Sequence, residues 1–191
     1  EGDAGSSTSA ISPAATGLTG RMVVVGGGMA GVTAAKYLRL WGGSGLTITL
    51  VEPATTYVSN IMSNLVLNGS RNVASLQFAR DALTSKYGVV RKAASLKTVN
   101  VAAHTVTLSD NTTLPYDRLV LAPGVRFEDA YGLTQADYDS RTPHAWRAGP
   151  QTTLLAQQIA AMANGDTFVM TIPKAPYRCP PGPYERACVV A

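Results

Sequence analysis

The sequence predicts an α/β protein built around a parallel β-sheet, and three segments near the start of the chain indicate this class. Residues 22–25 form a short apolar, β-branched run, which is typical of a strand buried on both faces. A helical pattern follows over residues 29–41, and residues 46–51 form a second apolar run. A strand, a helix and a strand in this order form a right-handed unit with parallel strands.

The helix of this unit is expected to lie on the sheet through one apolar stripe. Glycines mark both of its ends, because residues 26–31 interrupt the first strand and Gly42-Gly43 stop the helix. Apolar side chains recur between these ends at helical spacing. The expected stripe consists of Ala30, Ala34, Leu38 and Trp41.

A small antiparallel excursion is expected in the middle of the chain. Residues 99–107 and 118–121 are strand-like, and the turn-rich Ser109-Asp110-Asn111 lies between them. The second of these segments is expected to return to the parallel sheet and to end at Gly124.

The last part of the chain predicts the start of a second unit. Residues 154–162 are expected to form a helix, residues 168–172 a buried strand, and the proline-dense residues 173–183 a loop that opens a helix near Tyr184. The expected division is a flexible arm over residues 1–20, a Rossmann-type domain over 21–165 and an incomplete second α/β domain over 166–191.

Composition narrows the class of protein. Hydrophobic residues make up 46% and charged residues 15% of the 191 residues, as in an ordinary globular domain. The net charge is +4, but basic residues are scattered and do not alternate with aromatic ones, so we expect no nucleic-acid partner. No uninterrupted apolar stretch approaches the roughly 18 residues that a membrane-spanning helix needs, so no span is expected.

The first twenty residues are rich in glycine, alanine, serine and threonine and contain few large apolar side chains. Such a segment buries too little surface to offset the entropy of ordering, so we expect a flexible arm. The chain starts at Glu1, without an initiator methionine. This start favours an exported, periplasmic protein whose signal peptide has been removed, although a trimmed chain would look the same.

The glycine-rich turn carries the clearest functional signal. Gly26, Gly28 and Gly31 satisfy the pattern G-x-G-x-x-G directly after a predicted strand, and Glu52 ends the next strand. Gly26 would permit the tight turn, Gly28 the approach of a pyrophosphate, and Gly31 close packing of helix on strand. Glu52 would accept hydrogen bonds from the adenosine ribose. The predicted site also includes Met29, Ala30 and Pro53.

Several segments closely resemble the flavoprotein subunit of flavocytochrome c sulfide dehydrogenase, a relative of the sulfide:quinone oxidoreductases. The most specific is the stretch from Cys179 to Arg186, which has little chance of arising from generic α/β patterning. The resemblance runs from about residue 21 to 187. Besides residues 21–52, it is carried by residues 116–124, 143–149 and 177–187.

The resemblance implies a flavoenzyme. In this family sulfide attacks a redox-active disulfide beside FAD, and the electrons pass to a haem c subunit, a cytochrome c partner in the periplasm. Cys179 matches one cysteine of that pair, so it is the expected catalytic residue. An inert thiol on a proline-rich loop is the alternative.

The resemblance also implies contacts with the flavin. Ala122, Pro123 and Gly124 match the loop that approaches the flavin, and Met62 lies in a flavin-proximal segment. Asn60 stands where some relatives tether FAD through a cysteine, and an amide cannot make that bond. We therefore expect FAD to be held noncovalently.

The length of the chain and its two cysteines leave a second hypothesis about its function open. Relatives are about twice as long, and their second redox cysteine lies in the additional part, so we expect little turnover from these 191 residues. A truncated, non-catalytic paralogue that docks a cytochrome c or handles a metal such as Cu(I) is the alternative.

The sequence leaves undecided whether the thiols of Cys179 and Cys188 lie close together. His104 and His144 lack partners at metal-ligand spacing, so no metal site is predicted.

Overall fold

The computed structural model describes residues 9–177 and 179–191, which divide into two compact units. Unit 1 comprises Glu1–Tyr57 and Ala79–Arg126, and unit 2 comprises Val58–Phe78 and Phe127–Ala191. The boundary expected at residue 166 therefore falls inside unit 2. None of the helices in the described part of the chain is long and apolar enough to cross a membrane.

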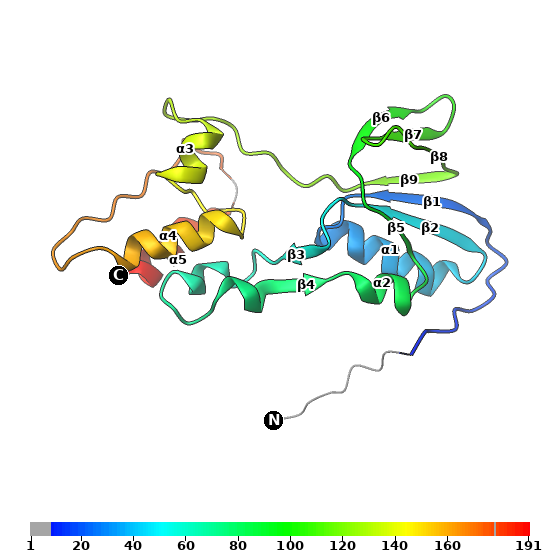
Figure 1. Ribbon diagram of the computed structural model, residues 1–191, viewed down its shortest axis with the longest axis horizontal. Coiled ribbons are helices and arrows are strands. Elements are labelled where there is room, and N and C mark those ends of the chain that lie inside the picture. Colours follow the sequence, from blue (N-terminus) through cyan, green and yellow to red (C-terminus); the bar gives the residue numbers. More distant parts are fainter. Residues whose placement is uncertain (1–8, 178) are drawn as a thin grey trace. The chain divides into compact units, whose positions relative to one another are not determined.

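Unit 1 contains a four-stranded parallel sheet in the order β5-β2-β1-β9, which confirms the predicted class (Figure 1). At the carboxyl ends of the strands Val25 pairs with both Val51 and Leu121, so the loops that follow these strands begin side by side. The strands are β1 (Gly20–Val25), β2 (Leu46–Val51), β5 (Val90–Lys92) and β9 (Arg118–Leu121).

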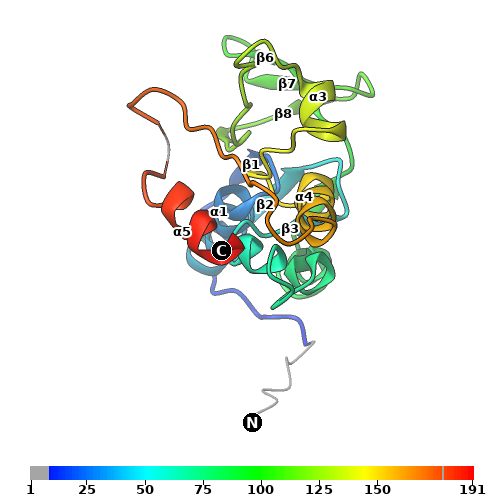
Figure 2. The same cartoon turned by 90° about the vertical axis from the view of Figure 1, so that its left-hand side faces the viewer.

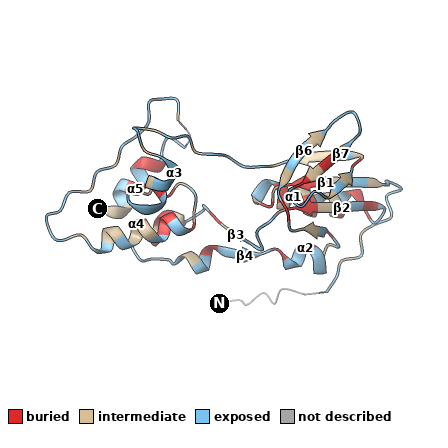
Figure 3. Ribbon diagram, turned by 45° about the horizontal axis from the view of Figure 1, so that its top comes forward, coloured by how far each residue is buried: buried red, intermediate tan, exposed pale blue. Residues whose placement is uncertain are grey.

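The helix α1 (Met29–Gly42) covers one face of this sheet, and the buried residues gather where it meets β1 and β2 (Figure 3). Its buried positions are Gly31, Ala35, Arg39 and Gly42, so the expected stripe is rotated by one residue, and Trp41 is 74% exposed. The physical reason is the close approach of Gly31 to the glycine turn, which sets the rotation of the helix about its axis.

The opposite face of the sheet is covered by a three-stranded antiparallel sheet, which confirms the expected excursion. Val106 and Leu108 of its central strand pack with Val25 and Val51. Residues 99–107 are two strands and not one, because the chain turns back at His104, where φ is 50°. The strands are β6 (Leu96–Asn100), β7 (Thr105–Leu108) and β8 (Thr113–Pro115).

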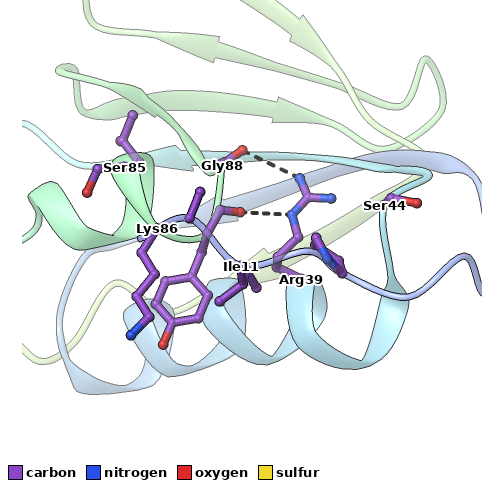
Figure 4. Close-up of a pocket in the computed structure, with 10 residues that line it drawn as sticks. Ile11, Arg39, Ser44, Ser85, Lys86 and Gly88 are labelled. Atoms are coloured by element: carbon purple, nitrogen blue, oxygen red, sulfur yellow. Dashed lines mark hydrogen bonds between the residues drawn. The ribbon is translucent and has the colours of Figure 1, made fainter. Parts of the chain in front are cut away.

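The described residues of the expected arm lie against unit 1. The backbone N–H of Ile11 donates to Lys86 O over 2.9 Å, and the hydroxyl of Thr16 donates to Gly42 O over 2.6 Å. Beside this segment lies a small pocket of about 220 Å³, where Arg39 donates to the carbonyls of Tyr87 and Gly88 (Figure 4). Residues 9–19 are therefore irregular in structure but held in place, while residues 1–8 lie outside the described part.

Unit 2 is mainly helical, and its helices are seen from another side in Figure 2. Leu67, Ala145 and Leu155 form its core, against which Phe168 packs. The helix expected over 154–162 begins earlier, at Pro150, because proline suits the first helical position. The helices are η1 (Ser63–Val66), η2 (Val73–Leu76), α3 (Gln135–Ser140), α4 (Pro150–Ala160) and α5 (Gly182–Val190).

The prediction of a strand over residues 168–172 is wrong. These residues have no regular structure, and Val169 is 75% exposed. A strand needs a neighbour for its backbone hydrogen bonds, and no described strand pairs with this segment. The helix expected near Tyr184 is present as α5.

Short elements complete the chain. The strands β3 and β4 form a two-stranded sheet where the chain passes between the two units. In unit 1 the helix α2 follows β4 directly. These elements are β3 (Thr56–Val58), β4 (Gln77–Ala79) and α2 (Asp81–Ser85).

Candidate functional site

The glycine turn of unit 1 cannot accept side chains at two of its positions. Gly26 has φ of 98°, and a Cβ placed there would lie 2.0 Å from Ala122 O. A Cβ on Gly31 would lie 1.7 Å from Gly26 O. Backbone therefore packs against backbone on both sides of the turn, so both positions require glycine.

Gly28 differs because a Cβ there would meet nothing within 4 Å. It is the N-cap of α1, so the turn presents the helix N-terminus at an open position. Met29 and Ala30 lie in the exposed first turn, and backbone N–H groups of such a turn lack intrahelical partners. The described first turn contains no acidic residue. A space beside a helix N-terminus fits a pyrophosphate.

Glu52 is held beside this turn by two backbone groups. Its Oε2 accepts from Gly27 N over 2.7 Å, and its Oε1 accepts from Ala54 N over 2.9 Å. A carboxylate can accept about four hydrogen bonds, so capacity remains for ribose hydroxyls. Pro53 is exposed, and its carbonyl accepts from Arg91 Nη2 over 3.0 Å. The carboxylate thus both shapes the turn and remains able to bind a sugar.

Arg80 lies beside the glycine turn and Glu52, and it was not predicted from the sequence as a site residue. It is 7% exposed, and it donates to Gly27 O over 2.9 Å and to Ala54 O over 2.8 Å. Burial lowers the pKa of its guanidinium, and the nearby carboxylate of Glu52 opposes that shift. A lone arginine before a short helix carries no motif, so no signal in the sequence indicated this role.

The loop after β9 contributes one group to the turn. Ala122 N donates to Val25 O over 2.8 Å, and its carbonyl faces Gly26. Pro123 and Gly124 are exposed, and Gly124 has φ of 78° with open space on its Cβ side. The structure therefore brings Ala122 into the glycine turn, and a flavin contact by this loop stays a prediction.

The other predicted flavin contacts belong to unit 2. Asn60 is exposed, and its Oδ1 accepts from Ala148 N over 2.7 Å. Met62 is 50% exposed with φ of 64° and caps η1. Asn60 thus ties two segments of unit 2 that are 88 positions apart.

Cys179 is exposed in unit 2, with its backbone in the left-handed region at φ of 57°. Its carbonyl accepts from Gly182 N over 2.9 Å, which closes a turn over Pro180-Pro181 immediately before α5. Cys188 is also free and exposed, so the two thiols form no disulfide. A non-glycine residue with positive φ persists only where its surroundings hold it, as at functional sites.

Within the described ranges, no three His, Cys, Asp or Glu side chains are grouped so that they could hold an ion. His104 stacks on Tyr116 at 5.5 Å, and His144 contacts Phe127 and Tyr138. Both histidines therefore pack against aromatic rings.

The parallel sheet, the glycine turn and Glu52 define a dinucleotide-binding oxidoreductase fold of the Rossmann type. The chain belongs to the pyridine nucleotide-disulphide oxidoreductase family, whose model matches residues 20–149, and among its members to the flavoprotein chains of flavocytochrome c sulfide dehydrogenase. The model for the central part of that flavoprotein chain matches residues 152–191. Membership of this family implies FAD as the cofactor.

Two curated relatives support this placement. The sulfide dehydrogenase flavoprotein chain of Chlorobaculum thiosulfatiphilum is 52% identical over 48 residues, which cover 25% of this chain and 98% of that relative. A probable ferredoxin reductase of Castellaniella defragrans is 32% identical over 108 residues, which cover 56% of this chain and 26% of the relative. The chain thus spans about a quarter of the ferredoxin reductase.

Solved structures show the same fold. The sulfide:quinone oxidoreductase of Aquifex aeolicus matches with a TM-score of 0.58 and 23% identity, over 74% of this chain and 32% of that chain. The putidaredoxin reductase in a covalent complex with putidaredoxin matches with a TM-score of 0.56 and 24% identity, over 73% of this chain and 34% of the other. These likenesses concern the fold alone.

Proposed function

We propose that this chain is the FAD-binding part of a periplasmic, sulfide-oxidising flavocytochrome c that passes electrons to a haem c subunit. The observation that carries the proposal is Cys179, an exposed thiol in a left-handed turn, inside the segment that matches the sulfide dehydrogenase flavoprotein model. Periplasmic location and the cytochrome partner rest on the resemblance described above.

The residues of unit 1 fit the adenosine diphosphate end of FAD. The open position over Gly28 and the N-terminus of α1 suit the pyrophosphate, and Glu52 suits the ribose. Bound FAD would supply a two-electron acceptor that passes electrons on singly. What the chain itself does there is bind and orient the cofactor.

Cys179 would supply the sulfur chemistry. Hydrosulfide attacks the Cys179 sulfur of a disulfide, the S–S bond breaks, and the second cysteine leaves as a thiolate while Cys179 becomes a persulfide. In the family pattern that second cysteine is not among these 191 residues, and Cys188 is free and exposed. The exposure of Cys179 lets a small anion reach its sulfur.

Asn60 supports noncovalent binding of FAD. A carboxamide cannot form the thioether that relatives make at this position, and its Oδ1 is engaged by Ala148 N. In this proposal Asn60 holds its loop through a hydrogen bond and not through a bond to the cofactor.

The test is the visible spectrum of the purified chain after incubation with FAD and gel filtration. Retained bands of oxidised flavin are expected for this chain. In a longer protein that also carries the second redox cysteine, anaerobic sulfide should bleach these bands. There Cys179→Ser should abolish bleaching, and Cys188→Ser, the matched control, should not. A chain that stays colourless with added FAD would refute the proposal and favour a non-catalytic docking protein.

A further inference from the structure

Arg186 is a buried cation in unit 2. It lies on α5, is 4% exposed, and directs all three guanidinium nitrogens at protein oxygens. Nε donates to Asn64 Oδ1 over 3.2 Å, Nη2 donates to Ala145 O over 3.2 Å, and Nη1 donates to His144 O. One side chain thus joins α5, η1 and the loop at residues 144–145, across 122 positions of sequence.

The carboxylate of Glu185, the preceding residue of α5, acts on this guanidinium electrostatically and partly opposes the effect of burial on its pKa. Among the described residues, no carboxylate lies within ion-pair distance of Arg186. Burial lowers the pKa of Arg186 to about 10, so it stays charged at neutral pH, and burial together with Arg186 lowers the pKa of His144. A buried charge that forms no ion pair is costly. Arg186 remains buried and charged only because its N–H donors are hydrogen-bonded to protein oxygens.

Trp146 connects the guanidinium to the thiol. The Arg186 Cζ lies 3.6 Å from the centre of the Trp146 ring. A Cβ on Gly182 would lie 3.3 Å from an edge atom of the same ring and 3.3 Å from Cys179 Sγ. The ring edge and the sulfur therefore meet at one small residue in the first turn of α5.

Cys179 needs such support. Its φ of 57° is unfavourable for a residue with a side chain, and the backbone keeps it only if neighbouring groups hold the turn. The Gly182 hydrogen bond closes the turn, and the Trp146 edge lies beside it. Removal of the Arg186 contact would free the ring on which this packing depends.

We propose that Arg186 is a positioning residue that fixes Trp146 and, through the Cys179–Gly182 turn, holds the Cys179 sulfur in place. The inference rests on the proposed function, because it assigns a purpose to the position of that thiol. Arg186 acts through Trp146 and touches no reacting atom.

The test measures alkylation of both cysteines by iodoacetamide in the reduced, purified chain, resolved by peptide mass spectrometry. The readout is the rate constant at Cys179, in the turn before α5, divided by that at Cys188, which lies on α5 together with Arg186. In Arg186→Met we expect the ratio to rise about tenfold, because the turn opens locally. Arg186→Lys keeps the charge but not the planar fork and should give an intermediate ratio. Arg71→Met, at an exposed arginine of unit 2, is the matched control and should leave it unchanged.

If Arg186 had a purely structural role, its loss would loosen unit 2 and raise the alkylation rates of both cysteines together. The ratio would then stay unchanged. An unchanged ratio in an Arg186→Met variant that keeps the native near-ultraviolet circular dichroism therefore overturns the proposal. If Arg186→Met does not fold, Trp146→Leu decides. It removes the ring on which Arg186 stacks and leaves the carbonyl and amide partners of Arg186 in place, and we expect about a threefold rise. No rise there refutes the coupling.

This experiment needs no flavin and no sulfide. A raised ratio in a chain that never binds FAD would support the role of Arg186 while the proposed function fails. Sulfide-dependent bleaching with an unchanged ratio would leave the function standing and reject the positioning role.

Discussion

Arg80 Nε lies 2.9 Å from the carbonyl oxygen of Gly27, although the two residues are 53 positions apart. The same side chain also reaches Ala54 O, so it joins the glycine turn to the loop after β2. Glu52 accepts from the N–H groups of these same two residues. The guanidinium of Arg80 thus binds the carbonyls of Gly27 and Ala54, and the carboxylate of Glu52 binds the N–H groups of the same two residues.

Replacing Arg80 should destabilise unit 1. Arg80→Met leaves the carbonyl of the buried Gly27 without its donor, which costs about 1–3 kcal/mol, whereas water can replace the donor to the exposed Ala54. We expect the free energy of unfolding to fall by roughly 1–3 kcal/mol. Urea unfolding followed by circular dichroism measures this change. Arg126→Met, at an exposed arginine, should change it by less than about 0.5 kcal/mol, and equal losses in the two variants would contradict the role.

Two glycines of the turn should respond differently to alanine. Gly31→Ala places a methyl group 1.7 Å from Gly26 O, where backbone must move, so a loss of about 3 kcal/mol or more is expected. Gly28→Ala meets open space at φ of −76°, so stability should be kept while FAD affinity falls. Thermal unfolding and FAD titration separate these effects. Equal melting temperatures for the two variants would refute the assignment.

Glu52→Gln should weaken FAD binding. The carboxylate accepts from Gly27 N and Ala54 N, and a glutamine amide offers an oxygen to only one of them. Charged hydrogen bonds contribute about 1.5–3 kcal/mol, so affinity should drop roughly tenfold to a hundredfold. Quenching of flavin fluorescence gives the dissociation constant. Glu128→Gln, at an exposed position of unit 2, serves as the control, and a similar drop there would argue against a specific role.

Asp137 should make the stability of unit 2 depend on pH in the acid range. The backbone N–H of Thr134, then the side chains of Arg141 and Thr134, lower the pKa of Asp137 from 3.8 to about 2. The folded state therefore binds this proton less readily than the unfolded state. Its stabilisation is complete above pH 4 and is lost as pH falls from 4 towards 2.

Asp137→Asn removes that dependence. The melting temperature of the wild-type chain should exceed that of the variant at pH 5, and the difference should shrink as pH is lowered to 2. Thermal unfolding at several pH values measures it. A difference that stays constant over this range would show that Asp137 does not titrate as described.

Local pattern explains which features could be predicted. The strand at residues 20–25, the glycine turn and the strand that ends before Glu52 are recognisable because each is encoded within a few neighbouring residues. The strand expected over residues 168–172 failed because apolar β-branched composition states only that a segment would suit a sheet. Its neighbours decide whether a partner strand exists.

The rotation of α1 about its axis is another feature that the local sequence pattern did not determine. Periodicity gave its length, but Gly31 had to face the turn, which buried Arg39 and left Trp41 in solvent. Asn60 likewise had no local signal for its bond to Ala148, 88 positions away.

The sequence by itself determined the α/β class, the dinucleotide turn with Glu52 and the family that its motifs define. Only the tertiary structure decided how Arg80 and Arg186 are used, since their partners lie 53 and up to 122 positions away. Glycine turns and strand periodicity are properties of adjacent residues. The partners of a buried cation are set by which distant backbone oxygens the fold leaves within its reach.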